Sequence, residues 1–236
     1  MQKSRTYRFI CLLAISLLCI PSFAKLGKGK DVLIADSASL FEGIAVSADM
    51  VGLFMKITNS KFANMEVSGR LNFYERYFPI VELGIGECEK IGGDNNNKFS
   101  TTAPYFRVGM DYNFNQKMNG NRLFGGVRYA HSSYKYDFFN PDFNDPVWGG
   151  TDPLNLSGMK GKSHWIELVV GVETKLWSFL RLGYNIRYRG RIKQKVSPFG
   201  EPWYVPGYGR NGSTAFGGTV NITFDIGKTS KIKRKK

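Results

Sequence analysis

Residues 65–74 decide the fold class, and they read Met-Glu-Val-Ser-Gly-Arg-Leu-Asn-Phe-Tyr. Apolar or small side chains occupy the odd positions, whereas Glu66, Ser68, Arg70 and Asn72 occupy even ones. Successive side chains of a β-strand point to opposite faces, so this alternation predicts a strand with one apolar and one polar face. No helical period fits the segment.

Seven further segments show the same period of two. They are residues 43–56, 79–88, 106–114, 121–136, 163–176, 180–189 and 215–226. The composition agrees, because the 236 residues include 27 Gly, 18 Phe and 12 Tyr, a mixture that favours strands joined by turns over helices. We therefore predict an all-β chain with eight strands.

The connections between these segments alternate in length. Short links join strands two to three, four to five and six to seven, at residues 75–78, 115–120 and 176–177. Long stretches rich in Asn, Gly, Pro and Asp join the others, at residues 88–103, 137–162 and 190–213; only the first link, 57–63, is short where a long one is expected. An even strand number with short turns at one end and long loops at the other is typical of outer-membrane barrels. The pattern predicts an eight-stranded antiparallel up-and-down transmembrane β-barrel over residues 43–227, with both termini in the periplasm.

The N-terminus reads as an export signal. Three basic residues precede the apolar run 9–20, which is too short to span a bilayer, and Ser22 and Ala24 suit cleavage. We predict a signal peptide at residues 1–24, a periplasmic lead at residues 25–42, and a protein placed in the cell outer membrane.

The C-terminal segment 228–236 is a basic tail with six positive charges. Removing these and the three charges of the signal peptide from the formal net charge of +14 leaves +5 for residues 25–227. No basic stripe interleaved with aromatics stands out, so nucleic acid is not an expected partner. Outer-membrane lipid is the expected one.

Alternation alone does not say which face is inside, since a secreted soluble barrel of the lipocalin kind would turn its apolar row inward. The polar row is nearly neutral, as a closed lumen requires, because an unpaired buried charge is costly. Its arginines are Arg70, Arg107, Arg122, Arg128, Arg181, Arg187 and Arg189, and its acids are Asp49, Glu66, Glu82, Glu87, Asp111, Glu167, Glu173 and Asp225. Glycines in the same row leave room for long side chains in a narrow interior. These features favour the membrane barrel.

The apolar row ends in aromatic side chains at both rims, which predicts two aromatic girdles at the membrane interfaces. One girdle comprises Phe54, Phe106, Tyr188 and Phe216, and the other comprises Phe73, Phe114, Trp177 and Phe224.

Cysteine and histidine usage excludes two kinds of site. Cleavage of the signal peptide leaves Cys88 as the single cysteine, so no intramolecular disulfide can form. The chain has only two histidines and no cysteine pair to join them, so we expect no metal site and no cofactor.

With its signal peptide, its eight alternating segments and its last strand at 216–226, the chain resembles the small outer-membrane β-barrels of Gram-negative bacteria, of the same build as the OmpA transmembrane domain and OmpX. The texture of residues 43–227, including the end Thr223-Phe-Asp-Ile-Gly227, is similar to uncharacterised barrels of Bacteroidetes. That resemblance implies no known activity. Many such proteins end in an aromatic residue, whereas here Phe224 is followed by the basic tail.

Residues 126–133, Gly-Val-Arg-Tyr-Ala-His-Ser-Ser, are also similar to the Arg-x-x-His-x-Ser segment of outer-membrane lipid A deacylases of the PagL type. That resemblance would make His131 the general base and Ser133 the nucleophile, which need an acid to orient the imidazole. Two departures stand against it. Tyr134 replaces the usual Asn, and only Asp142 and Asp145, both in a loop, are candidates for the acid.

Eight strands leave an interior just wide enough for side chains, so we expect a lumen plugged by its charges and not a diffusion pore. The predicted role is structural or in surface interaction, through the three long loops at 88–103, 137–162 and 190–213, which would contact an extracellular or envelope protein. The last loop carries the aromatics Phe199, Trp203, Tyr204 and Tyr208, which pack together, lie at the lipid interface or form a patch that binds a partner. We expect no enzymatic activity.

Overall fold

The computed structural model describes residues 40–58, 60–92, 97–115, 121–144, 149–198 and 200–227. The predicted signal peptide, nearly all of the periplasmic lead and the basic tail lie outside these residues. The fold therefore concerns the barrel region only.

Eight strands form one closed ring in the order β1-β10-β7-β6-β5-β4-β3-β2, and every neighbouring pair is antiparallel. Their bounds are β1 Phe41–Asp49, β2 Phe62–Phe73, β3 Tyr77–Ile91, β4 Lys98–Asn113, β5 Arg122–Asn144, β6 Thr151–Lys175, β7 Leu180–Lys195 and β10 Thr214–Ile226. Two further strands, β8 (Tyr204–Val205) and β9 (Gly209–Arg210), pair with each other inside the segment that joins β7 to β10. The predicted eight-stranded up-and-down barrel is confirmed.

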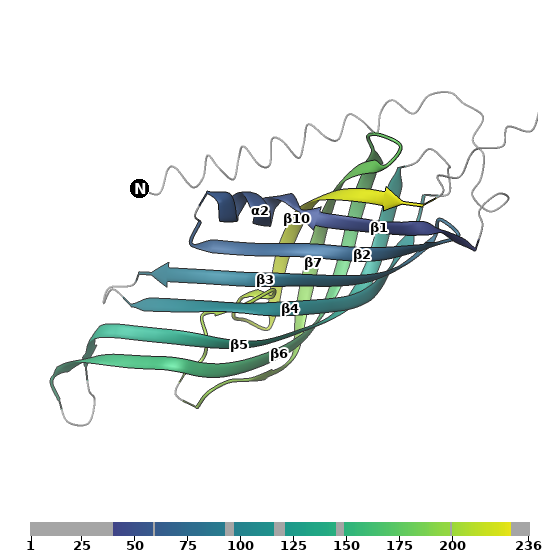
Figure 1. Ribbon diagram of the computed structural model, residues 1–236. Helices are drawn as coiled ribbons and strands as arrows, with labels where there is room; N and C mark the ends of the chain where they lie inside the picture. The colour runs from purple at the N-terminus through teal and green to yellow at the C-terminus, as the bar shows by residue number, and fades with distance from the viewer. Residues whose placement is uncertain are drawn as a thin grey trace, which may run out of the picture.

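The ring has two unlike ends. Short turns and the ends of β1 and β10 nearest the termini lie at one end, and the longer connections lie at the other (Figure 1). The hairpin of β5 and β6 extends past its neighbours, because β7 ends with the pair Lys195–Lys162 whereas β5 and β6 stay paired up to Asn144 and Thr151. The pairing register of this hairpin shifts twice, between Tyr136 and Phe138 and between Asn140 and Phe143, and bulges of this kind let the two strands stay paired.

Two of the loops are therefore shorter than the sequence predicted. Most of residues 137–162 is strand in β5 and β6, and β3 and β4 likewise take up most of residues 88–103. The cause is cross-strand pairing, which continues for as long as backbone partners face each other and is not visible in the composition of one segment.

Residues 50–57 form an α-helix, α2 (Met50–Ile57), where the sequence pattern predicted the continuation of a strand. The carboxylate of Asp49 accepts a hydrogen bond from the backbone N–H of Val51 at 3.0 Å and so caps the helix. The helix packs closely on β2, since a Cβ on Gly52 would lie 1.6 Å from the carbonyl oxygen of Asn64.

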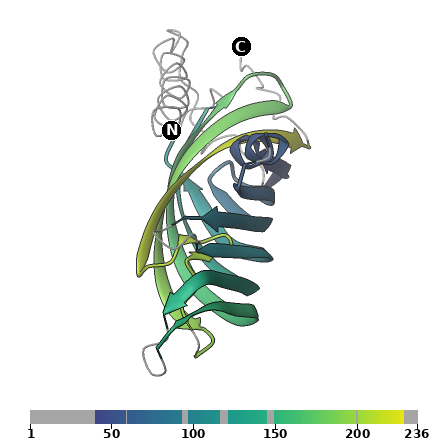
Figure 2. The same ribbon diagram turned by 90° about the vertical axis from the view of Figure 1, so that its left-hand side faces the viewer.

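Helix α2 lies where the pairing of β1 stops. The last pair between β1 and β10 is Asp49 with Asn221, so the half of β10 nearer the long-loop end has no strand partner on that side. Helix α2 contacts both β2 and β10 and lies beside them in Figures 1 and 2. A capped helix thus completes the barrel wall at its one short strand.

The two faces of the strands have opposite polarity. The side chains of Leu83 and Val127 point outward and are 62% and 53% exposed, whereas Arg107 and Glu167, which point inward, are 1% and 0% exposed. The polar row of the sequence is therefore the inside of the barrel. A small cluster of buried apolar and aromatic side chains, including Trp165 and Tyr136, fills the inside at the long-loop end.

Candidate functional site

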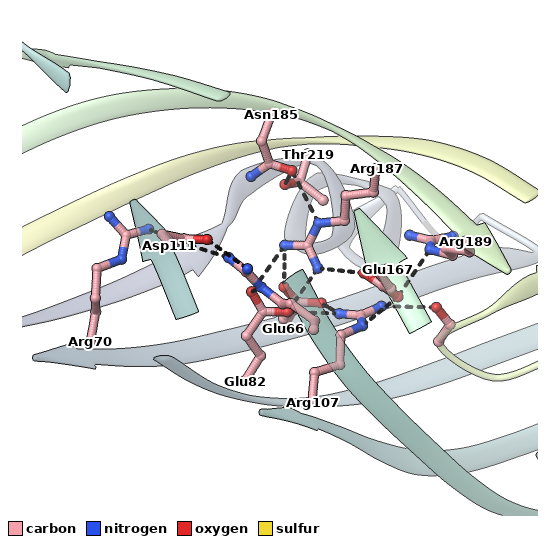
Figure 3. Close-up of polar contacts among 12 residues, drawn as sticks. Glu66, Arg70, Glu82, Arg107, Asp111, Glu167, Asn185, Arg187, Arg189 and Thr219 are labelled. Atoms are coloured by element: carbon pink, nitrogen blue, oxygen red, sulfur yellow. Dashed lines mark hydrogen bonds and ion pairs between the residues drawn. The ribbon is translucent and has the colours of Figure 1, made fainter. Parts of the chain in front are cut away.

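Three carboxylates and two guanidinium groups form the centre of the lumen (Figure 3). Arg187 lies 2.7 Å from Glu82, 2.8 Å from Glu66 and 3.5 Å from Glu167. Arg107 contacts the same three acids, at 3.2 Å from Glu82, 2.8 Å from Glu167 and in direct contact with Glu66. All five side chains are at least nine-tenths buried, and they come from five different strands. The cluster therefore ties opposite walls of the barrel together.

Neutral side chains hold this centre in place. Asn185 accepts a hydrogen bond from Nε of Arg187 at 3.0 Å and another from the hydroxyl of Thr219 at 2.9 Å. On the other side, the indole N–H of Trp165 donates to Glu167 at 2.6 Å. Arg187 and Glu167 thus have fixed neutral partners in addition to their counter-ions, and such additional hydrogen bonds make a buried ionic network tolerable.

A second group of ion pairs continues toward the short-turn end. Arg128 links the two groups, since it lies 2.8 Å from Glu82 and 2.6 Å from Asp111. Arg70 then pairs with Glu173 at 2.6 Å and lies 3.7 Å from Asp111.

The group ends at the rim of the short-turn end. Arg122 lies 3.4 Å from Glu173 and 3.5 Å from Glu75, and Arg181 pairs with Asp225 at 2.6 Å. The ion pairs thus extend from the centre of the lumen to the turns.

Among the described residues, the connected network is neutral, with seven arginines and seven carboxylates. The arginines are Arg70, Arg107, Arg122, Arg128, Arg181, Arg187 and Arg189, and the carboxylates are Glu66, Glu75, Glu82, Asp111, Glu167, Glu173 and Asp225.

The structure changes the membership that the sequence suggested at three positions. Asp49 caps helix α2, and Glu87 lies on the outer face of β3, where it pairs with Lys56. Glu75 enters the network instead, from the tight turn between β2 and β3, where its φ is 54°. A turn residue has no strand parity, so no sequence signal pointed to it.

Glycines make the space for these long side chains. A Cβ on Gly126 would lie 1.9 Å from Oδ1 of Asp111, and a Cβ on Gly217 would lie 2.8 Å from the guanidinium of Arg189. Both glycines are in the inward row of their strands.

Residues 200–213, here called the plug loop, fold back into the barrel from the long-loop end (Figure 2). Arg107 donates to the carbonyl oxygen of Gly207 at 2.8 Å, and Arg189 donates to that of Tyr208 at 2.7 Å. Val205 and Tyr208 are 0% and 1% exposed. The loop thus sits directly on the central arginines.

The position of the plug loop corrects the prediction that 190–213 is an outward-reaching recognition loop. The hydroxyl of Tyr204 and the amide of Asn64 exchange hydrogen bonds at 2.7 and 2.9 Å inside the wall of β2. The ammonium nitrogen of Lys90 lies over the ring of Trp203, 3.9 Å from the centroid of that ring. The arginines attract the loop because its backbone carbonyls are acceptors, a feature that side-chain patterns do not display. Phe199 lies outside the described residues.

Most of the predicted girdle residues lie on the outer surface at two levels. Phe106, Tyr188 and Phe216 are exposed at the level where the central network lies inside, and Phe73, Phe114, Trp177 and Phe224 lie near the short turns. Phe54 differs, because it is on helix α2 and not on a strand.

His131 and Ser133 lie in the outward row of β5, but no acid orients the imidazole within the described residues. The ring of His131 packs against the rings of His164 and Phe106 in tilted arrangements, with ring centroids 4.3 Å and 5.6 Å apart. Its Nδ1 is buried and has no hydrogen-bond partner among the described residues. Asp145, one of the two candidate acids, lies outside the described residues.

The described residues contain no group of three or more His, Cys, Asp or Glu side chains placed to hold a metal ion. No helix in the same residues has the length and hydropathy needed to cross a membrane.

Comparison with known proteins yields one family and one similar solved structure. The structure is that of Ail, the attachment invasion locus protein of Yersinia pestis, in complex with the heparin analogue sucrose octasulfate. The two chains are 8% identical, with a TM-score of 0.37, over 78% of this chain and 94% of Ail. No curated protein matches the chain. Residues 5–227 match the model of a domain of unknown function, DUF6048, and the chain belongs to this family.

Proposed function

We propose that this protein is an outer-membrane β-barrel with a plugged lumen, which serves as a structural or surface-interaction protein of the cell envelope and is not an enzyme. The observation that carries the proposal is the reversed polarity of the barrel, with ion pairs inside and apolar side chains outside. A soluble barrel requires the opposite arrangement, because an apolar row on its outer surface would be exposed to water. Lipid is the solvent that suits this exterior.

The height of the apolar band supports a bilayer. Phe106 on β4 and Phe114, which directly follows the end of β4, are eight residues apart, about 27 Å at the rise of a strand. With a strand tilt of about 40° this corresponds to about 21 Å along the barrel axis, close to the band of outer-membrane barrels. On β10, Phe216 and Phe224 have the same spacing. Both pairs suit aromatic girdles at the two interfaces.

The lumen contents support a plugged barrel. Arg107 and Arg187 cross the centre and bind acids from β2, β3 and β6, and the plug loop covers them. A solute would have to break several buried ion pairs to pass, at a cost of several kcal/mol each. We propose that the protein acts through its surface, above all through the protruding hairpin of β5 and β6, and not by conduction.

The experiment combines location, conduction and chemistry. Outer-membrane fractions are run on gels with and without boiling, and we expect a mobility shift that marks a folded barrel. The purified chain in planar bilayers is expected to show no stepwise conductance. Lipid A from cells carrying the wild-type protein or Ser133→Ala is compared by mass spectrometry, and we expect identical acylation. Absence from the membrane fraction would overturn the proposed location. Loss of an acyl chain in the wild-type cells alone would establish a deacylase.

A further inference from the structure

Five lysines gather on the outer surface of three adjacent strands, β5, β6 and β7, at the long-loop end. They are Lys135, Lys160, Lys162, Lys193 and Lys195, all exposed, and together they are called the lysine patch. Lys162, Lys193 and Lys195 line an open pocket with His164.

The register places like charges directly opposite each other. Lys162 is the cross-strand partner of Lys195, and Lys135 is the partner of Lys160. Like charges at directly opposed positions destabilise a sheet. None of the five lysines forms an ion pair with a carboxylate in the described part of the chain. By contrast, the lumen arginines are matched one to one by acids, so the patch has an uncompensated charge that the lumen does not have.

The level of the patch relative to the membrane indicates its ligand. Lys162 is four residues beyond the apolar Ile166 on β6, about 13 Å along the strand. With the usual tilt this is about 10 Å above the apolar band. Between the two levels lies His164, whose Nδ1 is 2.6 Å from the hydroxyl of Tyr129. The patch therefore lies at the height of lipid headgroups, with its polar and aromatic neighbours below it.

We propose that the lysine patch binds the phosphate groups of a phosphorylated glycolipid in the outer leaflet. This inference rests on the proposed function, which places the long-loop end at the outer surface. A phosphate between the opposed lysines would supply the negative charge that relieves their repulsion, and the acyl chains of the same lipid would lie along the apolar face of β5 and β6. The patch thus fixes one lipid at the wall beneath the protruding hairpin.

The test uses the full mature chain reconstituted in nanodiscs of phosphatidylethanolamine. Purified lipopolysaccharide is titrated in, and bound glycolipid is measured by native mass spectrometry. The double variant Lys162→Gln/Lys193→Gln is compared with Lys61→Gln/Lys98→Gln, which removes the same charge from exposed positions at the same end. A lysine near an anionic lipid surface contributes about fivefold in binding, so we expect about 25-fold weaker binding for the patch variant. The control variant should change it less than about twofold.

Two further arms identify the ligand chemistry. Lipopolysaccharide stripped of its phosphates should bind as weakly to the wild type as the intact lipid binds to the patch variant. Equal binding of the stripped lipid, or an unchanged affinity of the patch variant, would overturn the proposal. Retention of soluble dextran sulfate without retention of the glycolipid would also overturn it and assign the patch to a soluble polyanion.

Heat-modifiable mobility of each variant separates this inference from the function on which it rests. Variants that shift on boiling have folded, so weaker binding then reports the patch itself. A wild-type chain that does not insert would overturn both proposals, whereas an inserted chain with binding insensitive to the patch would overturn only this one.

Discussion

Replacing Glu82 by glutamine removes one negative charge from the centre of the lumen and leaves its arginines in excess. The carboxylate of Glu82 lies 2.7 Å from Arg187, 2.8 Å from Arg128 and 3.2 Å from Arg107, and the residue is 1% exposed. Removing one partner of a buried ion pair costs about 3–5 kcal/mol, because the remaining charge is uncompensated. We expect Glu82→Gln to lower the free energy of unfolding by that amount.

The assay is urea unfolding of the folded barrel in detergent micelles, followed by tryptophan fluorescence. With a urea dependence of about 2 kcal/mol/M, the midpoint should fall by about 2 M. Glu87→Gln is the matched control on the same strand, since that carboxylate pairs only with the exposed Lys56 across the outer surface among the described ion pairs. A loss below about 1 kcal/mol is expected for it. If both variants unfold at the same urea concentration, the lumen network does not stabilise the barrel and the reasoning is refuted.

Three further predictions concern packing and access. Gly126→Val should destabilise the barrel by about 1–3 kcal/mol, because its Cβ would lie 1.9 Å from Asp111; urea unfolding measures it, and Gly69→Val, where nothing lies within 4 Å, is the control. Gly207→Val should displace the plug loop, because its Cβ would lie 2.4 Å from an aromatic ring in the lumen and its φ is 78°. Limited proteolysis should then cleave the plug loop in this variant and spare it in the wild type. The thiol of Cys88 is 1% exposed, so maleimide should label it only after denaturation; labelling of the folded chain would contradict the burial.

Strand identity and facing were predictable because both are local properties. The alternation around Glu66 and Arg107 put the charges on one face, and the near balance of seven Arg against eight acids indicated that this face was closed. Eight segments with alternating link lengths then left one closed up-and-down arrangement as the simplest solution. These inferences needed no knowledge of which strands touch.

Helix α2 and the length of the β5–β6 hairpin were not predictable in the same way. The apolar residues of 50–57 fit a strand as well as a short helix, and the cap formed by Asp49 decides between them. The hairpin continues through two bulges because its two strands keep facing each other. Both outcomes depend on neighbours that a single segment does not show.

The sequence by itself determined that this chain has eight strands with a charged face and an apolar face, because side-chain parity follows from the geometry of the extended backbone. Only the tertiary structure decided which arginine meets which acid, how the plug loop covers Arg107, and that five lysines on β5, β6 and β7 face the same surface. Those contacts join residues that are many positions apart. Their distances are set by strand register and by the closure of the ring, which are properties of the whole barrel.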